Sequence, residues 1–127
     1  MILPTDSAKR KEYPIFTGCL AYFPRAIAQV AHQSFKNNEK HNGKDSPLEW
    51  SKDVSADHLD CIGRHLLDQL DTELDPIAEK VATAWRAMAE LEMALEGEGG
   101  NEQHHKNVAM ARVFEKERAT PLTNKAQ

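Results

Sequence analysis

The sequence predicts an all-α protein, a small antiparallel bundle of helices joined by short loops. Three segments carry apolar residues at steps of three and four, which is the spacing of one helix face. No segment alternates apolar and polar residues for long, and β-branched residues are sparse, so strands are not expected. Antiparallel helices with short connections form bundles.

The first predicted helix begins near Pro24, because proline fits the first turn of a helix. Its apolar residues follow at helical spacing: Ile27, Val30, Ala31 and Phe35. The polar pair Asn37-Asn38 and Gly43 weaken the pattern, and the stretch from Asn42 to Pro47 is expected to be a loop.

The second predicted helix starts at Ser55, a residue that often caps helix N-termini, and places Asp57 in the first turn. Apolar residues then recur at steps of three, four and four, at Leu59, Ile62, Leu66 and Leu70. We expect this leucine stripe to face the core.

The third predicted helix has Asp75 as its N-cap and Pro76 at its first position, and it ends at Gly97. Its apolar stripe comprises Ile77, Val81, Ala84, Met88, Leu91 and Leu95. A weaker helical segment follows over residues 102–118, and Thr120-Pro121 ends it before a loose tail.

A chain of 127 residues has room for one domain. We predict a helical domain over residues 10–96 and a C-terminal helical extension with a flexible tail over residues 97–127. Long helices around so small a core often complete themselves by forming oligomers.

Composition narrows the class of protein. The formal net charge of −4 disfavours a duplex nucleic-acid binder, which needs a basic surface to neutralise phosphates. No apolar core of a signal peptide follows the basic run Lys9-Arg10-Lys11, and no window suits a membrane-spanning helix. Two cysteines form no disulfide framework, so we expect the protein in a reducing cytoplasm.

Four charged residues share one face of the second predicted helix, opposite the leucine stripe: Asp57, Asp60, Arg64 and Asp68. One interpretation is an ordinary solvated face. The other is a carboxylate pair, Asp57-x-x-Asp60, on adjacent turns, which supplies the oxygen ligands that Mg²⁺ prefers.

The end of the first predicted helix carries a similar polar group, Asn38-Glu39-Lys40-His41-Asn42. It is either a polar helix terminus or a corner that binds phosphate and metal. Glu39 and Asn42 are three apart, as are Asp57 and Asp60, and two such pairs on antiparallel helices can face each other across a bundle.

Other candidate sites are weaker. Cys61 and His65 are four apart on one helix, but no Cys-x-x-Cys module accompanies them, so zinc is not favoured. Cys61 is expected to be structural rather than nucleophilic. Trp50, near Lys52, either stacks on a base or closes the end of the bundle.

Several blocks in order along the chain resemble the phage-type dATP/dGTP diphosphohydrolases. The resemblance covers roughly residues 10–96. The blocks are Tyr13-Pro14-Ile15-Phe16-Thr17-Gly18, Tyr22-Phe23-Pro24, Asn38-Glu39-Lys40-His41-Asn42, Pro47-Leu48-Glu49-Trp50, Ser55-Ala56-Asp57-His58-Leu59-Asp60, Arg64-His65-Leu66, Lys80-Val81-Ala82 and Ala84-Trp85-Arg86.

The resemblance implies an all-α fold of the MazG-like pyrophosphohydrolase type and a site for Mg²⁺ or Mn²⁺. Glu39, Asp57 and Asp60 are then the catalytic metal ligands, with Asn42 in the position of a fourth ligand. The family pattern has an acid where this chain has Asn42 and a longer acid where it has Asp57. Either fewer ions bind, or another acid such as Asp68 or Glu49 completes the set.

The implied reaction is dNTP + H₂O → dNMP + pyrophosphate, with dGTP or dATP as substrate and with the metal activating the water. The residues implied to contact phosphate, sugar or base are Asn38, Lys40, His41, Trp50, Lys52, Arg64 and His65. The resemblance also implies a homodimer or homotetramer and, in phages with 2-aminoadenine DNA, a supply of dGMP. The alternative is a catalytically inactive helical module that binds another protein, which the neutral Asn42 favours.

Overall fold

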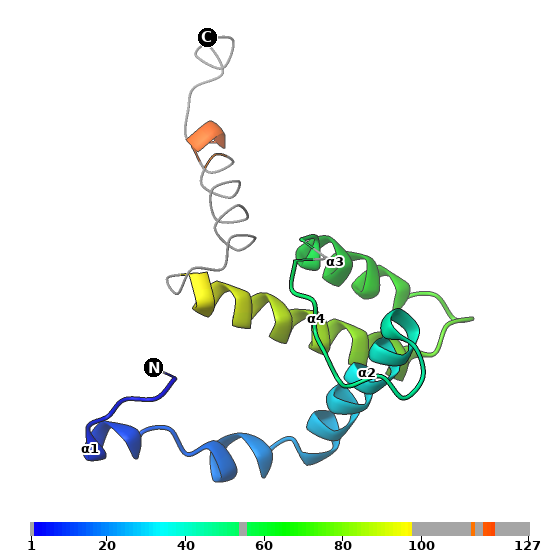
Figure 1. The fold of residues 1–127 in the computed structure, drawn as a ribbon. Helices are drawn as coiled ribbons and strands as arrows, with labels where there is room; N and C mark the ends of the chain where they lie inside the picture. Colours follow the sequence, from blue (N-terminus) through cyan, green and yellow to red (C-terminus); the bar gives the residue numbers. More distant parts are fainter. Residues whose placement is uncertain (1, 54–55, 98–112, 114–115, 119–127) are drawn as a thin grey trace. The chain divides into compact units, whose positions relative to one another are not determined.

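The computed structural model describes residues 2–53, 56–97, 113 and 116–118. These residues form helices and no strand, which confirms the all-α prediction (Figure 1). The chain divides into two compact units, residues 1–48 and 49–127, and each is described here by itself. Most of the predicted helix over residues 102–118 lies outside the described residues, although Val113 and residues 116–118 are helical.

The first unit contains a short helix α1 (Ser7–Arg10), a π-helix η1 (Phe16–Leu20) and the long helix α2 (Pro24–Asn42). Pro24 is the first residue of α2, as predicted. Gly43 follows the last residue with a backbone φ of 92°, a left-handed conformation that glycine adopts without steric cost. The helix therefore ends where the sequence indicated, and a loop begins.

The second unit is a helical hairpin of α3 (His58–Asp68) and α4 (Pro76–Glu96). The two helices lie side by side (Figure 1) and run antiparallel, because His58 contacts Arg86 whereas His65 contacts Glu79. Helix α4 has the predicted bounds: the Asp75 carboxylate accepts a hydrogen bond from the backbone N–H of Ile77 at 2.9 Å, and Gly97 follows the helix.

Helix α3 begins later than predicted. Asp57 is its N-cap residue rather than part of its first turn, and the Asp57 side chain does not cap the helix. Ser55, the predicted N-cap, lies outside the described residues. The backbone geometry explains the later start: Asp57 has a φ of −105° and a ψ of 35°, outside the helical region.

The leucine stripe of α3 does not face α4, so the expectation that it packs into the core is wrong for this hairpin. Leu59, Leu66 and Leu70 are 67%, 53% and 80% exposed, whereas Ile62, the fourth residue of the stripe, is half-buried. The buried residues of α3 are His58 and Cys61, and those of α4 are Ala89 and Met93. A third face of α3 contacts α4 instead. It carries His58, His65 and, just after the helix, Gln69, which bond Arg86, Glu79 and Thr83 of α4, and the buried Cys61 lies among them.

Among the described residues, no helix has the length and apolar composition needed to cross a bilayer.

Candidate functional site

The predicted carboxylate pair lies at the start of α3. Asp57 precedes the helix and Asp60 is in its first turn, and both side chains are exposed. Carboxylates are favourable at a helix N-terminus because the backbone N–H groups there carry partial positive charge. A hydrated Mg²⁺ needs only one or two protein carboxylates besides waters and substrate phosphates, so the donor chemistry of this pair fits that ion.

Arg64 accompanies this pair. Its Nη2 donates to the Asp57 carboxylate at 2.9 Å and to the Cys61 sulfur at 3.1 Å. The hydrogen bond to Asp57 raises the pKa of Arg64, so the guanidinium stays charged. The structure thus confirms that Asp57 and Arg64 share a face, and the side chain of Arg64, 61% exposed, is accessible to a bound anion.

The other predicted residues of this unit already contact neighbours. Lys52 forms an ion pair with Glu96 and lies 5.1 Å from the ring centre of Trp50. Trp50 packs edge to face on Trp85 with ring centres 5.6 Å apart. These contacts favour the structural interpretation of Trp50, which closes one end of the hairpin, over base stacking.

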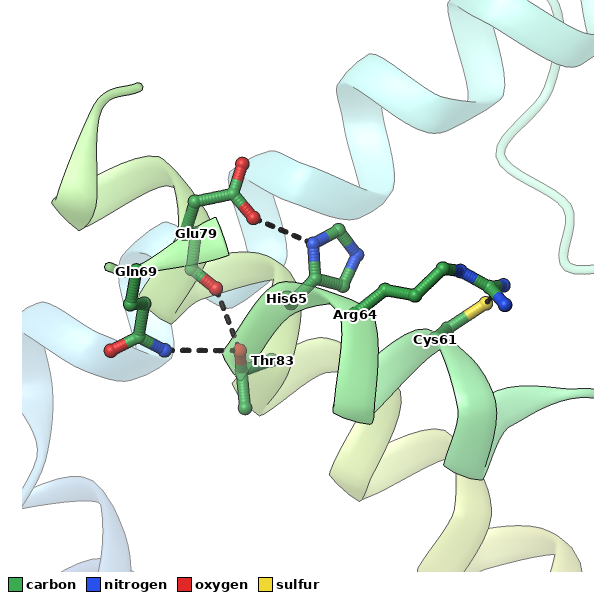
Figure 2. A network of polar contacts seen from close by, with 6 residues as sticks. All are labelled: Cys61, Arg64, His65, Gln69, Glu79 and Thr83. Carbon is green, nitrogen blue, oxygen red and sulfur yellow. Dashed lines mark hydrogen bonds and ion pairs between the residues drawn. The ribbon is translucent and has the colours of Figure 1, made fainter. Parts of the chain in front are cut away.

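His65 is held between the helices. Its Nδ1 donates to Oε2 of Glu79 at 2.7 Å, and the figure shows the ring turned toward that carboxylate (Figure 2). Thr83 donates to the backbone carbonyl of Glu79 and accepts from Gln69, which joins the same two helices. The expected role of His65 in binding base or sugar therefore competes with a contact inside the hairpin.

The polar end of α2 lies in the first unit. Glu39, Lys40, His41 and Asn42 are exposed, whereas Asn38 is buried. The Asn38 amide donates to the carbonyl of Ser46 at 3.0 Å, and its oxygen accepts from Asn42 at 2.8 Å. The two asparagines therefore fix the loop after α2, which is a structural use of their amides.

Asp57 and Asp60 thus belong to one unit, and Glu39 and Asn42 to the other. The prediction that the two pairs share one metal stays a prediction from the sequence. Within the described part of the second unit, neither Asp57 nor Asp60 belongs to a group of three metal-ligating side chains.

Three other side chains of this unit form a group that could hold a metal ion. The ligand atoms of His65, Asp68 and Glu79 all lie within 4.8 Å of one another. Asp68 was named from the sequence as part of a charged face and as an acid that could complete a metal site, whereas Glu79 was not named. The spacing His65-x-x-Asp68 places two ligands on one face, and that signal was available. Glu79 follows a turn, so its position depends on how the hairpin closes.

His58 is a buried group that sequence reasoning also missed. It is 1% exposed, and Arg86 donates to its Nδ1 over 3.1 Å. Arginine only donates, so the His58 Nδ1 is the unprotonated nitrogen and Nε2 carries the hydrogen. That Nε2 is buried without a hydrogen-bond partner among the described residues. Burial, followed by the charge of Arg86, lowers the pKa of His58 below 6.5.

We expect this histidine to make the protein sensitive to acid. The folded state keeps His58 neutral, so the unfolded state binds a proton more readily and stability falls as the pH drops below 6.5. Urea unfolding from pH 8 to about 5 measures this loss, which begins near the ordinary histidine pKa. The substitution His58→Gln should flatten the slope, whereas the exposed His32→Gln should leave it unchanged. Equal slopes in both variants and the wild type would contradict the assignment.

Comparison of the chain with protein-family models, with curated proteins and with solved structures finds no match.

Proposed function

We propose that this protein is a metal-dependent hydrolase that converts dGTP or dATP into the monophosphate and pyrophosphate. The observation that carries the proposal is the exposed carboxylate pair at the start of α3, Asp57 and Asp60, with Arg64 bound to it. This group stands in the sequence blocks that resemble the phage-type dATP/dGTP diphosphohydrolases. Two acids and one arginine beside a helix N-terminus can bind a metal–triphosphate complex.

The roles follow from the chemistry of each side chain. Asp57 and Asp60 hold Mg²⁺ or Mn²⁺, which when bound neutralises phosphate oxygens and lowers the pKa of a water molecule. Arg64 orients the Asp57 carboxylate and adds positive charge for the phosphates. The protein mainly positions the substrate and stabilises charge, since hydrolysis of the triphosphate needs no covalent intermediate on the chain.

The proposal keeps Glu39 as a further metal ligand and Lys40 and His41 as substrate contacts, on the strength of the sequence blocks alone. It assigns no substrate contact to Lys52 or His65, because each is paired inside the second unit.

We also propose that the protein is a homo-oligomer, a dimer or a tetramer, in which a second copy covers the leucine stripe of α3. Leu59, Leu66 and Leu70 are each more than half exposed in the single chain. Exposed apolar residues that gather on one face mark interaction surfaces, and small helical bundles often bury such faces against another copy. The molar mass from light scattering tests this directly.

The competing function is that of a helical interaction module without catalysis. The specific observation in its favour is Asn42, a neutral residue in place of an acid, whose amide nitrogen donates to the oxygen of Asn38. Such a module needs no metal and hydrolyses no nucleotide.

A product assay separates the two functions. Each of the four dNTPs, ATP and GTP is incubated with the protein and Mn²⁺, and the products are resolved by anion-exchange chromatography. We expect dGMP or dAMP together with pyrophosphate, and no product once EDTA removes the metal. Intact triphosphates throughout would contradict the proposal, and release of orthophosphate would assign a different reaction.

A further inference from the structure

A histidine and two acids meet between α3 and α4, at the end of the hairpin away from Asp60. His65 and Asp68 lie one turn apart on α3, and Glu79 lies in the first turn of α4. One ligand atom of each lies within 4.8 Å of the others, and the closest pair, His65 Nδ1 and Glu79 Oε2, is 2.7 Å apart. All three side chains are partly buried.

The group holds one acid more than the contact between the two helices uses. His65 donates a hydrogen bond to Glu79. The Asp68 carboxylate makes no hydrogen bond or ion pair with the part of the chain that the structure describes. Two carboxylates close together and partly shielded from water repel each other unless a cation lies between them. The contact between the helices needs only His65 and Glu79, so the Asp68 carboxylate beside them is available to a bound cation.

We propose that His65, Asp68 and Glu79 bind a divalent transition-metal ion. One imidazole nitrogen and two carboxylate oxygens suit Zn²⁺, Mn²⁺, Fe²⁺ or Co²⁺, whereas Mg²⁺ prefers oxygen ligands alone. Neighbouring ligands of a metal held at about 2.1 Å are about 3 to 3.5 Å apart. The His65 and Glu79 atoms lie closer than this and the whole set lies within 4.8 Å, so small side-chain rotations would bring the ligands to these separations. Binding through Nδ1 would release to solvent the proton that His65 donates to Glu79.

The surrounding contacts hold the two helices in place at this group (Figure 2). Gln69 donates to Thr83, and Thr83 donates to the backbone carbonyl of Glu79. Lys80 donates to the side-chain oxygen of Gln69 at 2.9 Å. The two ligands on α3 and the one on α4 are thus kept at a fixed separation, which lowers the ordering cost of binding an ion.

The site is separate from the carboxylate pair of the proposed hydrolase. Asp60 and Asp68 are eight residues apart on α3, about 12 Å along the helix axis. The inference therefore does not rest on the proposed reaction, and its test needs no nucleotide.

The experiment is a Co²⁺ titration of the full chain, followed by visible absorption. We expect a ligand-field band that saturates with the protein concentration, and a rise in Tm that grows with free Co²⁺. The decisive variant is Asp68→Asn, because Asp68 takes no part in the His65–Glu79 ion pair. It should weaken Co²⁺ binding at least about tenfold while the helical circular dichroism is unchanged.

Two further variants define the outcome. Asp71→Asn, in the turn after α3, should leave the Co²⁺ band unchanged, because Asp71 lies outside the group of three ligands. His65→Gln should abolish the band. A wild-type protein without the band, or an Asp68→Asn variant that binds Co²⁺ as tightly as the wild type, would overturn the inference and leave the group as an ion pair with a neighbouring acid.

Discussion

The substitution Asp60→Asn is expected to lower the rate of dNTP hydrolysis at least about a hundredfold, because it removes a charged metal ligand where even outer contacts are worth ten- to a hundredfold. The backbone of α3 should be unaffected, since the side chain is exposed in the first turn. Hydrolysis of dGTP is measured across a range of Mn²⁺ concentrations, together with circular dichroism. Excess Mn²⁺ should restore part of the activity, because an asparagine oxygen still binds the ion weakly.

The matched control for this prediction is Asp75→Asn. Asp75 caps α4, and asparagine caps a helix about as well as aspartate, so both fold and activity should be retained. An Asp60→Asn variant with full activity would sink the assignment of this carboxylate. A loss that no concentration of Mn²⁺ relieves would instead make Asp60 a proton acceptor rather than a metal ligand.

The helix ends that depend on local chemistry were predictable from the sequence. Pro24, Asp75 and Pro76 act through their own backbone or through a residue two positions away, so no distant partner is needed. The predicted start of α3, by contrast, was wrong. The Asp57 side chain accepts a hydrogen bond from Arg64 and none from the backbone N–H groups that a capping residue would satisfy.

The face on which α3 packs could not be predicted from its own periodicity. Its leucine stripe and the face of His58, Cys61 and His65 both have helical spacing, and which of them packs depends on what α4 presents in register. Because α4 offers Glu79 and Arg86, the face with His58 and His65 packs on it and the leucines stay exposed. Periodicity identifies an amphipathic helix but does not say which neighbour covers which face.

In the candidate site, too, contacts within one helix were predictable and contacts between two helices were not. Asp57 and Arg64 lie two turns apart on one face, so their pairing follows from helix geometry. The contact between His65 and Glu79 spans a turn and fourteen residues, and it depends on the register of the hairpin. A metal site built across that contact is therefore visible only once both helices are in place.

The substitution Met93→Ala should lower the free energy of unfolding by about 2 to 5 kcal/mol, the usual cost of truncating a buried large side chain. Met93 is 1% exposed on α4, and the only other buried apolar residues among those that the structure describes are Cys61 and Ala89, so little material can fill the space. Few neighbouring side chains can move into the cavity in a core this small, so we expect the full destabilisation that a cavity causes. Urea unfolding followed by circular dichroism measures it.

Met88→Ala is the matched control, since it makes the same change on the same helix at a residue that is 52% exposed. Its effect should stay within about 0.5 kcal/mol, because alanine is a good helix former and little surface is uncovered. Comparable losses at the two positions would mean that the exposed face of α4 is covered in solution. A negligible loss at Met93 would contradict the burial of this side chain.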